Sequence, residues 1–213
     1  MKGLLRKFFN TDSQEFVTVV SGLPRSGTSM MMKMLEAGGI PPMTDEIRTA
    51  DKDNPKGYYE FERVKQLDKG DTVWVKNAQG KVVKVISALL KHLPSEYEYR
   101  VIFMRRNMPE ILASQRKMLV RRGENPDKMD DEKMAALFDK HLQSVQEWLQ
   151  TQPNVSVLYV HYRDMLADPL PQIDKIIHFL DQDLNVEKMT DVVDPDLYRN
   201  RKGKLRNQRA GTG

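Results

Sequence analysis

The sequence has no cysteine among its 213 residues. Disulfide bonds, thiolate metal sites and cysteine nucleophiles are therefore excluded, and nothing points to an oxidising compartment. The sequence also begins without a long hydrophobic run. Its opening, MKGLLRKFFN, carries charges inside a very short apolar stretch. This stretch fits neither a secretory signal nor a membrane span, so we expect a cytoplasmic protein with no membrane span.

The sequence also lacks a strong excess of charge of either sign. It has 34 basic and 30 acidic residues, a formal net charge of +4. This mild bias suits a polyanionic nucleotide and does not call for nucleic acid, which we do not expect as a partner. The length suits one domain over residues 1–213, with 1–14 and 204–213 as flexible ends. Nothing in the sequence indicates the oligomeric state.

Short β-branched runs alternate with amphipathic segments along the chain. This alternation predicts right-handed parallel crossovers and an α/β fold, a three-layer α/β/α sandwich around a central parallel sheet. A proline-bearing stretch over 40–56 is too long for a tight connector, and such loops often carry function. The predicted strands are 16–21, 81–86, 100–104 and 155–160, and the predicted helices are 27–37, 89–93, 108–120, 130–150 and 169–180, with another beginning near Phe61.

The stretch from Val17 to Leu35 joins a strand, a glycine-bearing turn and a helix. Exposed amide hydrogens and the positive end of a helix dipole converge in such a turn and bind phosphate. The spacing from Gly22 to Gly27 fits the P-loop frame G-x-x-x-x-G-K-[ST], except that Thr28 replaces the lysine. Loss of that lysine argues against a γ-phosphoryl donor, and Arg25 supplies a positive charge instead.

The turn LPRSGTS over 23–29 resembles the 5'-phosphosulfate loop of sulfotransferases that use 3'-phosphoadenosine 5'-phosphosulfate (PAPS). In these P-loop folds Pro-[Arg/Lys]-Ser-Gly-Thr-[Thr/Ser] replaces the Walker lysine motif. The alternative is a tight strand-to-helix turn that binds no ligand. The resemblance implies that the 5'-phosphosulfate is bound by Arg25, Ser26, Gly27, Thr28 and Ser29.

Arg106 and Ser114 lie eight residues apart, at a strand end and two turns into the next helix. Both can face the crevice where α/β sheets bind ligands. The pair resembles the sulfotransferase 3'-phosphate site, in which an arginine and a serine at this spacing bind the phosphate that ATP lacks. A planar guanidinium suits a bidentate contact to that group. A surface arginine beside a helix-facing serine is the alternative.

Two further segments resemble the family near the C-terminus. The segment 160–169, VHYRDMLADP, is similar to a Tyr-Glu-Asp-Leu...Asp-Pro segment whose tyrosine contacts adenine, which implies this role for Tyr162. A buried structural tyrosine is the alternative. Lys202, in Arg-Lys-Gly over 201–203, matches a motif that closes over the 3'-phosphate, although the following Gly-Asp-Trp is absent. A solvated basic tail would explain this segment equally well.

Sulfuryl transfer by in-line displacement needs a base for the acceptor and cations near the leaving oxygen. Lys84 lies inside the apolar run 81–86, where an ammonium group is costly unless it has a partner or a function. It matches the lysine that sulfotransferases place at the end of the third strand. The resemblance implies that Lys84 and Arg25 stabilise the leaving group, whereas snorkelling to the sheet's edge is the alternative.

The base has three candidates. Glu46 and Arg48 follow Arg25 by 21 and 23 positions, a spacing similar to the Gly-Glu-Glu-Thr-Arg segment of tyrosylprotein sulfotransferases, which implies that Glu46 is the base. Glu60 is the reserve candidate. His92 superficially resembles the histidine of a Lys-Thr-His-x-Pro motif, but it lies beyond a predicted helical turn after the strand, so we interpret it as a helix-end residue.

Together these motifs predict a PAPS-dependent sulfotransferase that transfers a sulfuryl group to a hydroxyl or amine, releases 3'-phosphoadenosine 5'-phosphate (PAP) and needs no metal. The alternatives are a P-loop nucleotide kinase or NTPase and a non-catalytic module that binds PAPS or PAP. The acceptor, whether a small molecule, a peptide or a glycan, is not encoded in these motifs. Tyr58, Tyr59, Trp74 and the region 129–138 could line its pocket, although core packing would also explain them.

Overall fold

The computed structural model describes residues 16–45 and 59–193. Four parallel strands form one sheet in the order β2-β1-β3-β4. Because the strands are parallel, their carboxyl ends meet at one edge of the sheet, where α/β proteins bind ligands. The α/β class with a central parallel sheet is confirmed. The strands are β1 (Phe16–Gly22), β2 (Val82–Lys84), β3 (Glu98–Arg105) and β4 (Val155–His161).

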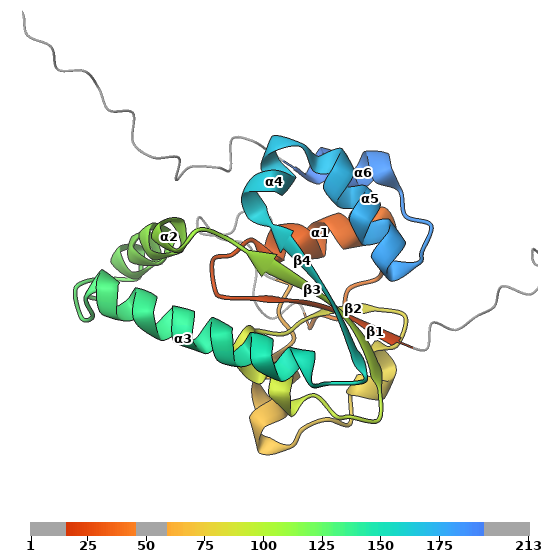
Figure 1. Cartoon of the computed structure of the whole chain (residues 1–213), viewed down its shortest axis with the longest axis horizontal. Coiled ribbons are helices and arrows are strands. Elements are labelled where there is room, and N and C mark those ends of the chain that lie inside the picture. Colours follow the sequence, from red (N-terminus) through yellow and green to blue (C-terminus); the bar gives the residue numbers. More distant parts are fainter. Residues whose placement is uncertain (1–15, 46–58, 194–213) are drawn as a thin grey trace, which may run out of the picture.

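Helices cover both faces of the sheet (Figure 1). One face carries α1 (Thr28–Gly38), α4 (Tyr162–Ala167), α5 (Pro169–Leu180) and α6 (Val186–Val192). The opposite face carries three 3₁₀ helices and one long helix, namely η1 (Glu62–Lys69), η2 (Val75–Ala78), η3 (Ser87–His92) and α3 (Asp131–Gln150). The remaining helix, α2 (Met108–Arg121), follows β3 and packs against α3.

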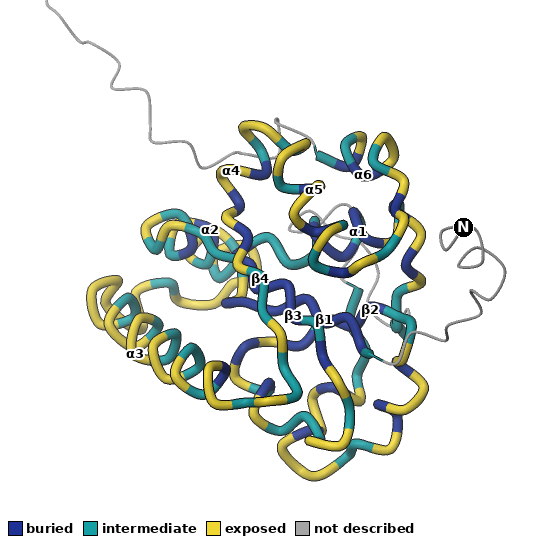
Figure 2. Tube along the Cα trace, turned by 45° about the vertical axis from the view of Figure 1, so that its right-hand side comes forward, coloured by how far each residue is buried: buried dark blue, intermediate teal, exposed yellow. Residues whose placement is uncertain are grey.

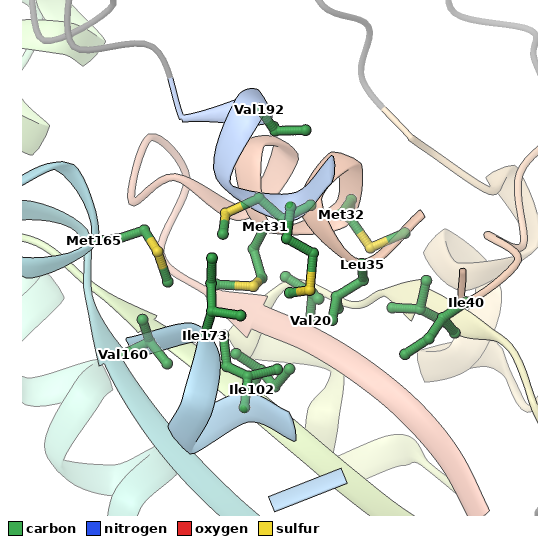
Figure 3. Packing of buried hydrophobic residues seen from close by; sticks show 14 of the residues in the cluster. Val20, Met31, Met32, Leu35, Ile40, Ile102, Val160, Met165, Ile173 and Val192 are labelled. Carbon is green, nitrogen blue, oxygen red and sulfur yellow. The ribbon is translucent and has the colours of Figure 1, made fainter. Parts of the chain in front are cut away.

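The core between the sheet and α1 is rich in methionine (Figure 3). Met31 of α1, Met165 of α4 and Met189 of α6 are fully buried there against Val20 and Ile102 of the central strands. Unbranched thioether side chains fill irregular gaps between helices that cross at different angles. This core therefore holds the start of α1 firmly against the carboxyl edge of the sheet.

A second core lies on the opposite face, because alternate residues of each strand point the other way. Val19 and Val101 contribute to it from the central strands. Trp74 is only 2% exposed, its ring packs edge to face against Phe61 with centroids 5.4 Å apart, and its Nε1 donates to the carbonyl of Asp71 at 2.9 Å. Trp74 is therefore a core residue rather than a wall of an open pocket.

The structure departs from the predicted elements in three places. The strand predicted over 81–86 ends at Lys84, because the chain turns at Ile86 into η3. The short helices η2, α4 and α6 were not predicted, since four to seven residues carry little periodicity. The apolar face predicted on 130–150 is only partly covered, with Leu137 54% exposed, because the first half of α3 packs on α2 rather than on the sheet (Figure 2).

Within the described residues, no helix combines the length and apolar character that crossing a bilayer would require.

We expect Met31→Ala to lower the free energy of unfolding by about 2 to 5 kcal/mol, because it removes a fully buried side chain and leaves a cavity under α1. Urea denaturation followed by circular dichroism measures this loss. Leu170→Ala is the matched control, since Leu170 is half exposed and its loss should change stability by no more than about 0.5 kcal/mol. Equal losses for the two variants would contradict the assigned core.

Candidate functional site

The turn between β1 and α1 lies at the carboxyl edge of the sheet. Two of its residues have left-handed backbone angles, Arg25 with φ of 70° and Gly27 with φ of 103°, and the Ser26 amide donates to the Leu23 carbonyl at 3.2 Å. No acidic side chain lies in the first turn of α1, so nothing there offsets the positive end of the helix dipole. The turn can therefore hold an anion against the first amides of α1.

Two features favour glycine at position 27: its positive φ angle and the close approach of the Tyr162 ring. A Cβ atom at Gly27 would lie 2.4 Å from Cδ2 of Tyr162, which is far inside contact distance. Tyr162 is buried, and its ring also lies 4.4 Å from the guanidinium carbon of Arg106. The tyrosine ring thus touches both the turn and this arginine, as a buried structural tyrosine would, while its contact with adenine stays a prediction.

Arg106 lies directly after β3, and its position is fixed by three groups. Its Nε forms an ion pair with Glu110 Oε2 at 3.0 Å, its Nη1 donates to the carbonyl of Arg25 at 3.1 Å, and its guanidinium stacks on Tyr162. The Arg106 side chain is only 8% exposed, and a charge that deeply buried needs such partners. The arginine predicted for the 3'-phosphate therefore lies beside the predicted phosphosulfate turn.

Ser114 completes the same group of residues. It is buried on α2, and its Oγ accepts a hydrogen bond from Arg25 Nε at 2.9 Å, across 89 positions of sequence. The guanidinium that the sequence assigns to the phosphosulfate thus contacts the serine assigned to the 3'-phosphate. Arg25 therefore joins the turn to the Arg106 and Ser114 pair.

Lys84 ends β2, the strand next to β1. Its Nζ lies 3.5 Å from Ser29 Oγ in the first turn of α1. The ammonium group therefore faces the start of α1, beside the turn between β1 and α1. Together with Arg25 and Arg106, it places three cations around one helix N-terminus.

The side chain of Ser26 points into the protein. Its Oγ is buried and has no hydrogen-bond partner among the described residues. A Cβ atom at Gly22 would lie 2.6 Å from this oxygen and 2.7 Å from the carbonyl oxygen of Met104, so only glycine fits there. Thr28 and Ser29, the first two residues of α1, are half-buried beside the turn.

Two predicted residues, Glu46 and Lys202, lie outside the described residues, as does Arg48. The neighbour of Glu46 is described: the amide of Asp45 donates to the Glu60 carbonyl at 3.4 Å, and its carboxylate accepts from the Glu62 amide at the start of η1. Asp45 and Glu60 are therefore adjacent in space.

The two other base candidates lie in described segments of the chain. Glu60 Oε2 lies 3.6 Å from Lys65 Nζ, so its carboxylate has a cation close by. His92 is the last residue of η3, which confirms the interpretation as a helix-end residue.

Tyr59 donates a hydrogen bond to the Glu36 carboxylate, and burial together with this contact raises the pKa of the Tyr59 phenol.

Sequence reasoning missed two supporting contacts. Glu110 forms an ion pair with Arg106. Because Glu110 follows Arg106 by four residues, a spacing at which opposite charges often pair, the sequence could have identified this contact. Ser87 and His141 form a hydrogen bond of 2.8 Å across 54 positions, which no local pattern reveals. Among the described residues, no group of three or more histidine, aspartate or glutamate side chains is placed to hold a metal ion.

Comparison with known proteins identifies the family. Residues 17–210 match the family described as the sulfotransferase domain, and the chain belongs to it. The prediction of a sulfotransferase is thereby confirmed. No curated protein sequence matches the chain significantly.

Many solved structures resemble the chain in fold, two of them as follows. The sulfotransferase domain from the curacin biosynthetic pathway is 15% identical with a TM-score of 0.51, and the match covers 84% of this chain and 78% of that one. The mouse sulfotransferase SULT7A1, complexed with PAP, is 18% identical with a TM-score of 0.53, and the match covers 84% of this chain and 63% of that one. The chain thus spans less than two thirds of the mouse enzyme, and at these identities the likeness concerns the fold alone.

We expect Gly27→Ala to destabilise the protein more than Gly39→Ala. Both glycines have positive φ, so each alanine carries backbone strain of about 1 to 2 kcal/mol. At Gly39 no described residue lies within 4 Å of the new methyl group, whereas at Gly27 the methyl group overlaps Tyr162, which should add about 1 to 3 kcal/mol. Parallel urea titrations measure the difference, and equal losses would show that Tyr162 does not constrain the turn.

Proposed function

We propose that this sulfotransferase uses PAPS as its donor and transfers the sulfuryl group to a hydroxyl or amine acceptor. The observation that carries the proposal is the junction of Arg25, Arg106 and Ser114. At this junction an arginine and a hydroxyl that could bind a second phosphate lie beside the turn that we propose binds the first. A donor with phosphate groups at both the 5' and 3' positions fits this arrangement better than a triphosphate does.

The residues present have the chemistry that such a donor needs. Guanidinium groups bind phosphate oxygens in bidentate fashion, and the amides at the start of α1 favour an anion. Glu110 pairs with Nε of Arg106 and thereby orients the guanidinium. Arg25 and Ser114 already share a hydrogen bond, so both can turn to a phosphate without leaving a buried group unpaired.

In the proposed reaction the acceptor oxygen or nitrogen forms a bond to sulfur while the bond from sulfur to the bridging phosphate oxygen breaks. The electron pair of that bond leaves with PAP, and the acceptor's proton passes to a base. Lys84 and Arg25 would stabilise the charge that develops on the phosphate oxygen, since both cations lie near the first turn of α1. The other proposed contacts to the donor are Ser26, Gly27, Thr28, Ser29, Tyr162 and Lys202.

Glu46 is the proposed base. We assign this role from its spacing after Arg25, which resembles that of the catalytic glutamate in tyrosylprotein sulfotransferases. The preceding residue, Asp45, donates its amide to the Glu60 carbonyl and accepts from the Glu62 amide.

Phosphoryl transfer from ATP is disfavoured by the same geometry. A P-loop kinase uses its lysine and an aspartate at a strand end to bind phosphates and magnesium. Here β3 ends at Arg105 and is followed by Arg106, and β4 ends at His161, so neither strand ends in an aspartate.

We also propose that residues 1–213 form a single domain, since the matched family region extends from residue 17 to 210.

Arg106→Ala should weaken PAP binding by about 10- to 150-fold, because it removes charge-assisted hydrogen bonds to the 3'-phosphate. Binding of 5'-AMP, which lacks that phosphate, should change much less. Lys84→Ala should instead lower kcat by about 100- to 1,000-fold and keep the preference for PAP over 5'-AMP. Isothermal titration calorimetry and transfer of labelled sulfate from PAPS measure these effects. An unchanged PAP preference in Arg106→Ala would contradict the 3'-phosphate assignment.

Glu46→Gln should lower kcat by about 100- to 10,000-fold with PAP affinity unchanged, because an amide cannot accept the acceptor's proton. Glu60→Gln is the matched comparison and should keep most of the activity. Steady-state transfer assays with a panel of hydroxyl and amine acceptors test the pair. Full activity of Glu46→Gln would reject it as the base, and PAP binding without turnover for any acceptor would favour a non-catalytic module.

A further inference from the structure

One side of the backbone of β4 is open in the described part of the chain. The strand order β2-β1-β3-β4 places β4 at the end of the sheet (Figure 2). The amide of Tyr99 on β3 donates to the carbonyl of Asn154 at 2.9 Å, and Tyr99 lies beside Val155 in the register. A residue in a parallel pair bonds the two neighbours of its partner, so the peptide groups of Val155, Val157 and Tyr159 face away from β3. A row of amide donors and carbonyl acceptors therefore lies along the open side of β4.

The two edges of the sheet differ in how they are protected. At the other edge β2 has only three residues, and an earlier segment covers it: the amide of Val82 donates to the Pro41 carbonyl at 3.0 Å, and the amide of Met43 donates to the Val82 carbonyl at 2.8 Å. In contrast, β4 has seven residues and pairs with β3 along its whole length without a bulge. It contains no proline, lysine, arginine, aspartate or glutamate. Short length, bulges, charges and proline are the features that blunt an exposed edge, so β4 has the character of a strand that pairs with a further strand.

The side chains next to this edge are apolar on both faces of the sheet. Val157 is half-buried against the core under α3, and Leu158 is half-buried against the core under α1. Tyr159 is 38% exposed, and its ring lies 5.7 Å from that of Phe103. A second strand laid along β4 would therefore cover apolar surface as well as pair the open peptide groups.

We propose that β4 pairs antiparallel with β4 of a second copy of this chain, so that the two sheets join into one across a twofold axis at Leu158. In this register Val157 of one copy lies opposite Tyr159 of the other. Both residues present their peptide groups to the open side, so each such pair exchanges two hydrogen bonds. An aromatic ring opposite a β-branched side chain is also a favourable cross-strand pair.

The strand is complementary to itself in this register. Leu158 faces Leu158 of the other copy, and Ser156 faces Val160, so no acid, lysine or arginine of β4 meets a like charge. A twofold dimer requires a patch of this kind, because the same residues contribute from both copies. The occupant of the β4 edge is therefore a second copy of the chain, and its binding does not depend on the donor or the acceptor.

A single cysteine tests the register, because the chain has none of its own. Leu158→Cys should give a covalent dimer under mild oxidation. Directly opposed residues that exchange no hydrogen bonds have Cα atoms about 4.5 Å apart, within the range of about 4.4 to 6.8 Å that a disulfide needs. Val73→Cys is the matched control, since its side chain is 74% exposed between η1 and η2, and it should give little covalent dimer at the same concentration. Non-reducing gel electrophoresis measures both yields, and equal yields would overturn the register.

The unmodified chain provides a test that depends on no variant. Sedimentation velocity should give twice the mass of the chain, and the amides of Val157 and Tyr159 should exchange hydrogen more slowly as the protein concentration rises. A chain that stays monomeric at all concentrations would overturn the proposal. If its amides at Val157 and Tyr159 are nevertheless protected, a segment of the same chain pairs with β4 in place of a second copy.

Charges at the twofold axis test the pairing in a third way. Leu158→Lys and Leu158→Glu should each weaken the dimer about tenfold or more, because like charges then face each other across the axis. Mixing the two variants should restore a dimer that contains one copy of each, which native mass spectrometry detects. Circular dichroism checks that both variants are folded. Dimers as tight as that of the unmodified chain in both variants would reject the pairing at Leu158.

Discussion

The buried guanidinium of Arg106 is the constraint on which the rest of the site depends. Removing a cation from water is costly, so it is tolerated only where several partners compensate for the lost hydration. Arg106 has the Glu110 carboxylate, the carbonyl of Arg25 and the ring of Tyr162 as partners. Each partner comes from a different part of the chain. The arginine can therefore stay buried only when α2, the turn between β1 and α1, and α4 are all in place.

The parallel sheet makes this assembly possible. Its central strands both end at the edge where the turn lies, so segments far apart in sequence meet there (Figure 1). Gly27 then lets Tyr162 approach the turn, which no larger residue allows. The methionine-rich core under α1 holds the helix start in register with that edge (Figure 3). Packing and charge thus favour the same geometry at the turn between β1 and α1, where we propose that an anion binds.

Sequence reasoning succeeded where the signal was local. The β-branched runs predicted four strands within a few residues of their ends, and the spacing from Arg106 to Ser114 predicted two side chains that indeed lie beside the turn. It could not show that Arg25 bonds Ser114 or that Ser87 bonds His141, because each contact depends on how helices pack. The half-covered face of α3 has the same cause, since its periodicity indicates an apolar side but not how much of that side is covered.

Sites of different kinds differ in how the sequence encodes them. The proposed donor site uses a turn, a strand-end arginine and a helical serine, and each leaves a short motif in the sequence. A cavity between packed helices is instead made from surfaces of separate elements. One such cavity, between η3 and α3, brings together Ser87 and His141, which are 54 positions apart, so no local pattern indicates it. Local motifs can therefore predict a phosphate-binding turn and its neighbours, whereas a site between packed helices is found only in the structure.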